Sequence, residues 1–204
     1  MRSATAERRC GNSRPAWRNG MGTEVQIREA THGDLDRVVE LYDAICDYLD
    51  ATFNYPGWTR GEYPARWTAE QALANGELYV CADGEALLGT CILNGVQPEG
   101  YRDIPWQEGI SPAEVLVVHT LAVHPDHLRE GVSGHLLRFA EQYAQGHGKR
   151  SIRLDVYERN VPGVRLYERH GYHVAGKTDL HLGDNGPQIS RCYEKIIDKG
   201  ERLC

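Results

Sequence analysis

Residues 121 to 137, LAVHPDHLREGVSGHLL, place a glycine-containing loop between an apolar run and an amphipathic pattern. The pattern predicts a strand that ends near Pro125, a loop around Gly131 and a helix after it. The first turn of a helix exposes backbone N–H groups without internal partners, and the peptide dipoles add partial positive charge there. Glycine lets the backbone approach a bulky group. We therefore expect an anion such as a pyrophosphate, although many such turns hold no ligand.

Other ligand classes fit this sequence poorly. It contains no GxxxxGK[ST], which excludes an ordinary P-loop, and no GxGxxG, because the loop has only Gly131 and Gly134. Nine histidines raise the question of zinc. The groups at 124–127 and 170–173 have neither a cysteine partner nor i, i+4 helical spacing, so we expect no metal.

The elements around the loop alternate between strand and helix patterns. Alternating or β-branched runs predict strands at 23–30, 77–96 (a hairpin turning at 83–84), 114–123, 151–156, 172–182 and 187–197. Apolar residues at helical spacing predict helices at 35–49, 67–76, 132–146 and 161–171. Thr31 and Asp34 resemble a capping pair before the first helix. Interleaved strands and helices indicate a mixed sheet with helices on both faces.

Composition favours one ordinary globular domain. The chain has 204 residues, 41% hydrophobic and 25% charged, and no run near the ~18 apolar residues that span a bilayer. No secretory signal is present, and the six cysteines are scattered, which favours a reduced, cytoplasmic protein. The net charge of -6 argues against general binding of nucleic acid. We expect residues 1–21 to be a disordered tail or a misplaced start, 22–198 the domain, and 199–204 a C-terminal tail.

Two stretches together resemble the GNAT acetyltransferase superfamily. LAVHP followed by LREGVS is similar to its strand end and [Q/R]xxGx[G/A] loop; Gly131 matches, whereas Leu128 and Ser133 depart. NVPGVRLYERHGY is similar to the family's Asn-x-x-Ala-x-x-Leu-Tyr-x-x-x-Gly-[FY], with Gly163 in place of alanine. The order of elements from residue 23 to 197 also agrees.

The resemblance implies a fold and an activity. The fold is α/β, a GNAT-like three-layer α/β/α arrangement with a central mixed, mostly antiparallel sheet. The activity is N-acetyl transfer from acetyl-CoA, as co-substrate, to an amine of a small molecule or peptide by direct attack on the thioester. The alternative is a non-catalytic acyl-CoA-binding or sensing module of the same fold. A third possibility is an interaction domain with an empty cleft.

The resemblance also implies the residues that bind coenzyme A. The strand pairs with the pantetheine amides, the N–H of Val123 polarises the thioester carbonyl, and the loop holds the pyrophosphate. Because backbone N–H groups hold the phosphates, leucine at position 128, where the family has Gln or Arg, removes only a side-chain contact to the ligand. Asn160 would bond to the pantetheine arm, and it also suits a helix start. The cofactor-binding set is Leu121, Ala122, Val123, Arg129, Glu130, Gly131, Val132, Ser133, Gly134, Asn160 and Tyr167.

Two side chains are implied as catalytic. A lysine-like amine has a pKa of ~10.4, so its deprotonation at pH 7 costs roughly 4–5 kcal/mol, and a base offsets this. His119 lies where some family members carry a histidine base, and even spacing places it on the face of Leu121 and Val123. Tyr167 is the candidate acid for the leaving thiolate. The alternatives are a histidine satisfied within the sheet and a packed helix tyrosine.

The acceptor is the least specified partner. Loops 50–66 and 97–113 are rich in aromatic and acidic residues, and equivalent loops wall the acceptor site in the family. Such walls suit a cationic amine with an apolar body. The same aromatic side chains could instead cover the core, with the acids in solvent. We expect an amine acceptor, no nucleic acid, no membrane and a possible homodimer.

Overall fold

A computed structural model describes residues 16–18, 24–180 and 188–197. Its sheet has the order β1-β2-β3-β4-β5-β6-β8-β7, and every described neighbouring pair is antiparallel except β5 and β6. The strands are Ala16–Arg18 (β1), Glu24–Glu29 (β2), Leu78–Asp83 (β3), Ala86–Asn94 (β4), Val115–Val123 (β5), Ser151–Tyr157 (β6), His173–Asp179 (β7) and Ile189–Ile196 (β8). The α-helices are Leu35–Ala51 (α1), Arg66–Ala74 (α2), Val132–Gly146 (α3) and Val161–Arg169 (α4).

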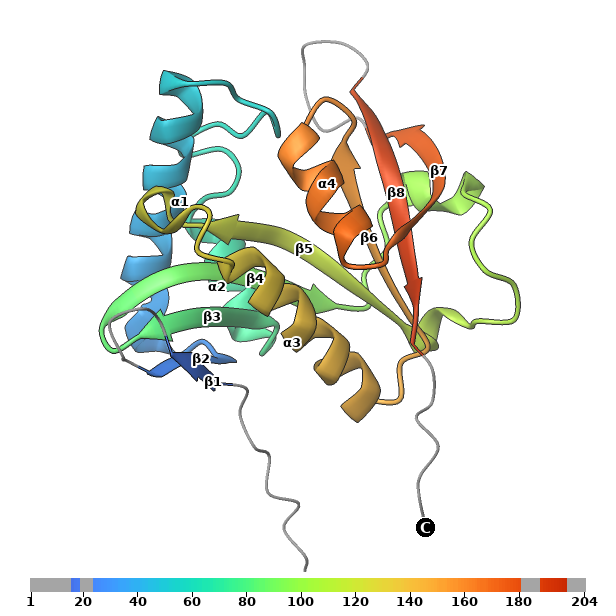
Figure 1. The fold of residues 1–204 in the computed structure, drawn as a ribbon, viewed down its shortest axis with the longest axis horizontal. Coiled ribbons are helices and arrows are strands. Elements are labelled where there is room, and N and C mark those ends of the chain that lie inside the picture. Colours follow the sequence, from blue (N-terminus) through green and yellow to red (C-terminus); the bar gives the residue numbers. More distant parts are fainter. Residues whose placement is uncertain (1–15, 19–23, 181–187, 198–204) are drawn as a thin grey trace, which may run out of the picture.

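Helices cover both faces of the sheet (Figure 1), which confirms the expected three-layer α/β/α fold. On one face, α1 and α2 pack on β3 and β4 through residues such as Leu41 and Ala69. On the other face, α3 and α4 bury Leu136, Leu137 and Tyr167 against the sheet. A third cluster, around Tyr101, packs on the α1 side of β5 and β8. The helix periodicities predict these faces because apolar residues recur at helical spacing.

The predicted elements agree with the observed ones to within a few residues. The hairpin turns at Gly84, and a short 3₁₀ turn, Glu99–Asp103 (η2), lies inside the predicted loop 97–113. Three residues of the segment expected to be disordered, Ala16–Arg18, form β1 and pair with β2. The rest of that segment, the expected 184–186 turn and the C-terminal tail lie outside the described residues.

The start of α1 is closed by its own side chains. Asp34 Oδ2 accepts hydrogen bonds of 2.8 Å from the Thr31 backbone N–H and from the Thr31 hydroxyl, as the capping pair predicts. Arg28 and Arg37 also bond to this carboxylate, at 2.7 Å and 2.8 Å. The hydrogen bond from Arg28 is the main reason that the pKa of Asp34 is held well below its usual range. Every charge in this cluster is compensated.

Three further properties concern the described residues as a set. Their four cysteines, Cys46, Cys81, Cys91 and Cys192, are buried free thiols. None of the helices in this set combines the length and apolar composition that crossing a bilayer requires. In the same residues, no group of three or more His, Cys, Asp or Glu side chains is arranged to hold a metal ion.

Candidate active site

The loop between β5 and α3 is an open set of backbone donors. Gly131 precedes α3 with a φ of 84°, and Arg129 has a φ of 68°. The N–H groups of residues 129–134 donate to no backbone acceptor among the described residues; the first such bond runs from the His135 N–H to the Gly131 carbonyl, at 3.1 Å. Consecutive N–H groups in such turns form anion-binding concavities. Residues 129–131 are exposed, so the predicted cradle is open to solvent.

Close packing fixes this loop on the sheet. Val132 and Leu136 are buried against β4, where Gly89 leaves room for them. A Cβ on Gly89 would lie 2.8 Å from the Ala122 carbonyl oxygen and 2.9 Å from a methyl carbon of Val132. The side chain of Val132 therefore belongs to the core, and only its backbone N–H is available to a ligand.

The sheet opens beside this loop. β5 and β6 pair in parallel only from Val115 to Val117, opposite residues 151–153. Beyond that point β5 continues along β4 toward α3, whereas β6 continues along β8 (Figure 1). The far edge of β5, residues 118–123, has no strand partner among the described residues on the β6 side. We name this gap the β5–β6 opening.

A β-bulge in β5 corrects one expectation about the site. Ile92 pairs with His119 and Thr90 with Ala122, so β5 holds one more residue than β4 between these pairs. Thr120 absorbs it with a φ of 45°. The extra residue shifts the alternation of side chains, so His119 lies on the α1 side of the sheet. Leu121 and Val123 pack on the α3 side, so His119 does not share their face, contrary to even spacing.

His119 is half-buried and held by its Nε2 atom. Nε2 lies 3.0 Å from Asn94 Oδ1 and 3.1 Å from the Val96 carbonyl oxygen. Asn94 Nδ2 donates to Glu77, which fixes the amide orientation. Because two acceptor oxygens face Nε2, Nε2 carries the proton and Nδ1 keeps its lone pair. Burial lowers the pKa of His119 below its usual value, so the ring is neutral at pH 7.

The other two predicted side chains flank the opening on α4. Asn160 Oδ1 accepts a 3.0 Å bond from the Gly163 N–H, so it caps α4 as the sequence allows. Tyr167 packs beside Tyr172 and Tyr193. Burial raises the pKa of Tyr167, and the negative charge of Asp155 adds to that effect. This phenol therefore keeps its proton.

Sequence reasoning missed Asp155, whereas Tyr101 belongs to the aromatic set expected in loop 97–113. Asp155 lies two residues past the last parallel pair of β6, on the same face as His119. The Tyr101 hydroxyl donates to Asp155 Oδ1 at 2.8 Å, and burial raises the pKa of Asp155. The available signal was a carboxylate within strand 151–156. This residue indicates the site only after the structure has shown where β5 and β6 separate.

Tyr63 closes the same region from the loop between α1 and α2. Its hydroxyl lies 2.6 Å from Thr120 Oγ1, at the bulge. Trp58 and Trp67 contact the Tyr63 ring, with centroids 6.2 Å and 6.4 Å away. Part of the aromatic set predicted from loop 50–66 therefore reaches the opening.

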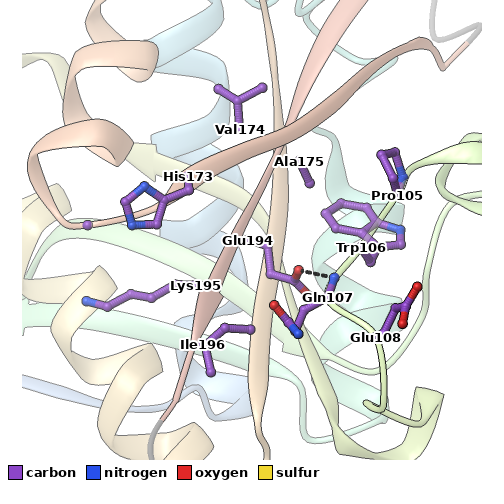
Figure 2. Close-up of a pocket in the computed structure, with 11 residues that line it drawn as sticks. Pro105, Trp106, Gln107, Glu108, His173, Val174, Ala175, Glu194, Lys195 and Ile196 are labelled. Atoms are coloured by element: carbon purple, nitrogen blue, oxygen red, sulfur yellow. Dashed lines mark hydrogen bonds between the residues drawn. The ribbon is translucent and has the colours of Figure 1, made fainter.

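A separate groove of about 660 Å³ lies at the β7 edge (Figure 2). Trp106, Val174, Ile196 and Glu194 are among the residues that line it. In Figure 2 the Glu194 carboxylate points to the Gln107 N–H, which donates to it at 2.8 Å. This groove is outside the opening, and its polar floor is bonded within the protein.

Comparisons with known proteins point in one direction. The family model described as "Acetyltransferase (GNAT) family" matches residues 39–172. An uncharacterised N-acetyltransferase of Methanocaldococcus jannaschii is 30% identical over 152 residues, which are 72% of this chain but only 59% of that protein's length. The crystal structure of a GNAT-family acetyltransferase from Streptococcus agalactiae has a TM-score of 0.70 at 22% identity, covering 86% of this chain and 96% of that one. A putative acetyltransferase from Salmonella typhimurium, solved with acetyl-CoA, has a TM-score of 0.60 at 16% identity, covering 85% and 94%.

Proposed function

Because the chain belongs to the acetyltransferase (GNAT) family, we propose that it transfers an acetyl group from acetyl-CoA to an amine of a small molecule or peptide. The single observation that carries this proposal is the row of N–H groups at residues 129–134 that have no backbone acceptor among the described residues, with residues 129–131 exposed, close after a strand that separates from its neighbour. The buried free thiols are consistent with action in the cytoplasm.

The residues present fit coenzyme A. The exposed donors before and within the first turn of α3 suit the two charged groups of a pyrophosphate, and Gly131 brings no side chain between them. The unpaired edge of Leu121, Ala122 and Val123 supplies backbone groups for an amide-containing arm. Bound there, acetyl-CoA supplies an activated acetyl group as a thioester. Arg129, Glu130, Val132, Ser133 and Gly134 contribute backbone N–H groups, and Asn160 and Tyr167 lie on the α4 side.

The proposed reaction is direct transfer. A bond forms between the amine nitrogen and the acetyl carbon, and the carbon–sulfur bond breaks. An ammonium group loses two protons in the process: the base takes one, which frees the attacking lone pair, and the other balances the proton that sulfur gains. His119 is the proposed base, because its Nδ1 has a free lone pair and its ring is neutral at pH 7. The N–H of Val123 is the proposed donor to the carbonyl oxygen.

Tyr167 is the proposed donor toward sulfur. A phenol of pKa ~10 is a weaker acid than a thiol of pKa ~8.5, and burial weakens it further. The role therefore rests on a hydrogen bond that strengthens as negative charge develops on sulfur.

The test compares two glycines at opposite ends of α3. Gly131 and Gly148 have φ values of 84° and 66°, and neither has an atom closer than 3.9 Å to the position of an added Cβ. Alanine therefore causes the same backbone strain at both. We expect Gly131→Ala to weaken coenzyme A binding about tenfold by calorimetry, and Gly148→Ala to leave it unchanged.

The second arm measures thiol release from acetyl-CoA with a panel of amines. Turnover with any acceptor supports the enzyme. Tight coenzyme A binding with no turnover over a broad panel supports the non-catalytic sensing module instead. If coenzyme A does not bind the wild-type chain, both assignments are wrong.

A further inference from the structure

A buried carboxylate, Glu194, and a partly buried one, Asp155, lie on the same face of neighbouring strands, and the first is fully compensated. Glu194 of β8 pairs with Arg153 Nε at 2.9 Å and accepts from the Ser151 hydroxyl at 2.6 Å. It also accepts from the Gln107 N–H, and Arg153 lies 4.4 Å from the centroid of the Trp106 ring. The protein thus provides a cation and further donors for this charge.

Asp155 lacks that compensation. Its hydrogen bond within the described residues comes from Tyr101, and no Lys, Arg or His of these residues forms an ion pair with it. The titratable groups whose states Asp155 influences are Tyr101 from η2, Cys192 from β8, Tyr167 from α4 and Tyr63 from the loop before α2. Burial raises the pKa of each of these four groups, so all are neutral near pH 7.

A buried carboxylate without a cation is costly for a protein to maintain. Such a carboxylate is expected where a bound ligand supplies the missing positive charge. Asp155 is placed for this role because it lies just past the point at which β5 and β6 separate. Tyr101 occupies Oδ1, so Oδ2 is the oxygen left to bind a ligand.

We infer that Asp155 binds the ammonium group of the acceptor, and that the acceptor is a small monocationic primary amine with an apolar body. This inference rests on the proposed function and names the substrate class of that site. An α-amino acid fits less well, because its carboxylate would lie near the negative charge of Asp155, and the nearby cation Arg153 is already paired with Glu194. The contact between Tyr63 and Thr120 places an aromatic loop against β5 beside the opening, which favours a small molecule over a polypeptide.

The probe series keeps the amine and the ring constant. 2-Phenylethylamine carries the ammonium group alone, phenylalanine adds a carboxylate, phenylalanine amide masks that carboxylate, and a phenylalanine-initiated tripeptide adds a chain. We expect kcat/KM for phenylalanine to be at least about tenfold below that for 2-phenylethylamine, and the amide to recover most of the loss. Equal turnover of phenylalanine, or a preference for the tripeptide, would overturn the assigned class.

Asp155→Asn tests the residue directly. Asparagine keeps the size and the acceptor for Tyr101 but removes the charge. We expect KM for 2-phenylethylamine to rise about 30-fold, the value of a charged hydrogen bond, while kcat changes less than about threefold. The melting temperature should stay the same or rise, because an unpaired buried charge is lost. Asp103→Asn, an exposed carboxylate of η2, is the matched control and should leave KM unchanged.

The readouts separate this inference from the proposed function. An unchanged KM in Asp155→Asn overturns the inference while acetyl transfer stands. A fall in kcat at unchanged KM also overturns it, since Asp155 then handles a proton rather than a bound charge. If the wild type turns over no amine, calorimetry of 2-phenylethylamine with the chain saturated with coenzyme A decides. Binding that Asp155→Asn abolishes supports the inference, and no binding overturns it.

Discussion

The starts of α1 and α3 are built in opposite ways. At α1, the 3₁₀ turn His32–Asp34 leads into the helix; Thr31 and Asp34 form the capping box of that turn, and two arginines neutralise the carboxylate. At α3, Gly131 offers no side-chain cap, and the N–H groups around it face solvent. Both helices pack on the same sheet, so the difference does not arise from the fold class. Polar groups that serve stability are satisfied within the chain, whereas those that serve a ligand are left available.

The largest expected effect is on the closed start. Asp34→Asn should lower the free energy of unfolding by about 3 kcal/mol, because it leaves two arginines without their buried partner. Denaturant unfolding at pH 7 measures this. Asp36→Asn is the control: the Asp36 side chain is 81% exposed, against 1% for Asp34, so it should cost less than about 0.5 kcal/mol.

The same pair gives a pH dependence with a definite sign. The folded-state pKa of Asp34 is lowered, so its stabilisation is present above the unfolded pKa of ~3.9 and is lost as pH falls further. The difference between wild type and Asp34→Asn should therefore shrink below about pH 4. A difference that persists unchanged at pH 2.5 would contradict the electrostatic account.

The next effect comes from closing the open start. Gly131→Asp places a negative charge among the donors, and aspartate tolerates positive φ better than most residues. Coenzyme A binding should weaken about 100-fold by calorimetry, with the melting temperature little changed. Gly131→Asn has the same shape without the charge, and should weaken binding no more than about tenfold. Equal losses would show that strain, not charge, governs the loop.

Substitution of His119 tests whether side chains near the opening determine the reaction rate rather than the stability of the fold. His119→Ala should lower kcat/KM about 100-fold near pH 7 and remove the acidic limb of the rate–pH profile. Since burial lowers the pKa of His119, that limb should lie below about pH 6.5 in the wild type. A limb that survives the substitution would assign the base to another group.

The smallest expected effect is at Tyr167. Tyr167→Phe should lower kcat about tenfold and leave the dissociation constant of coenzyme A within about twofold, because the ring packing is kept. Pre-steady-state and binding measurements separate the two. An unchanged kcat would remove Tyr167 from the leaving-group step, with solvent supplying the proton.

The sequence predicts most of the fold because local patterns determine it. The α1 face, the capping pair Thr31–Asp34 and the β5–α3 loop each follow from residues close together in the chain. The contact between Tyr101 and Asp155 joins residues 54 positions apart. No local pattern contains that pairing, since it depends on how loop 97–113 folds over β6. Asp155 alone resembles any polar residue near a strand end.

The bulge in β5 was not predicted from the sequence, for a different reason. Thr120 has a positive φ, which β-branched residues adopt rarely, so its residue type argues against the conformation that it has. The surrounding pairs with β4 impose it. Alternation therefore placed His119 on the wrong face even though the strand bounds were right.

The inserted residue Thr120 divides β5 into two parts. Residues before it lie beside the loops that would receive the acceptor. Residues after it lie beside the helix that would hold the acyl donor. Deletion of Thr120 would leave Ile92 opposite His119 and Thr90 opposite Ala122, with a regular strand between them. Leu121 and Val123 would keep their face, but the local bend of the bulge would be lost, together with the hydroxyl that meets Tyr63. A chain without Thr120 is thus expected to keep its core and to differ from the wild type beside the opening.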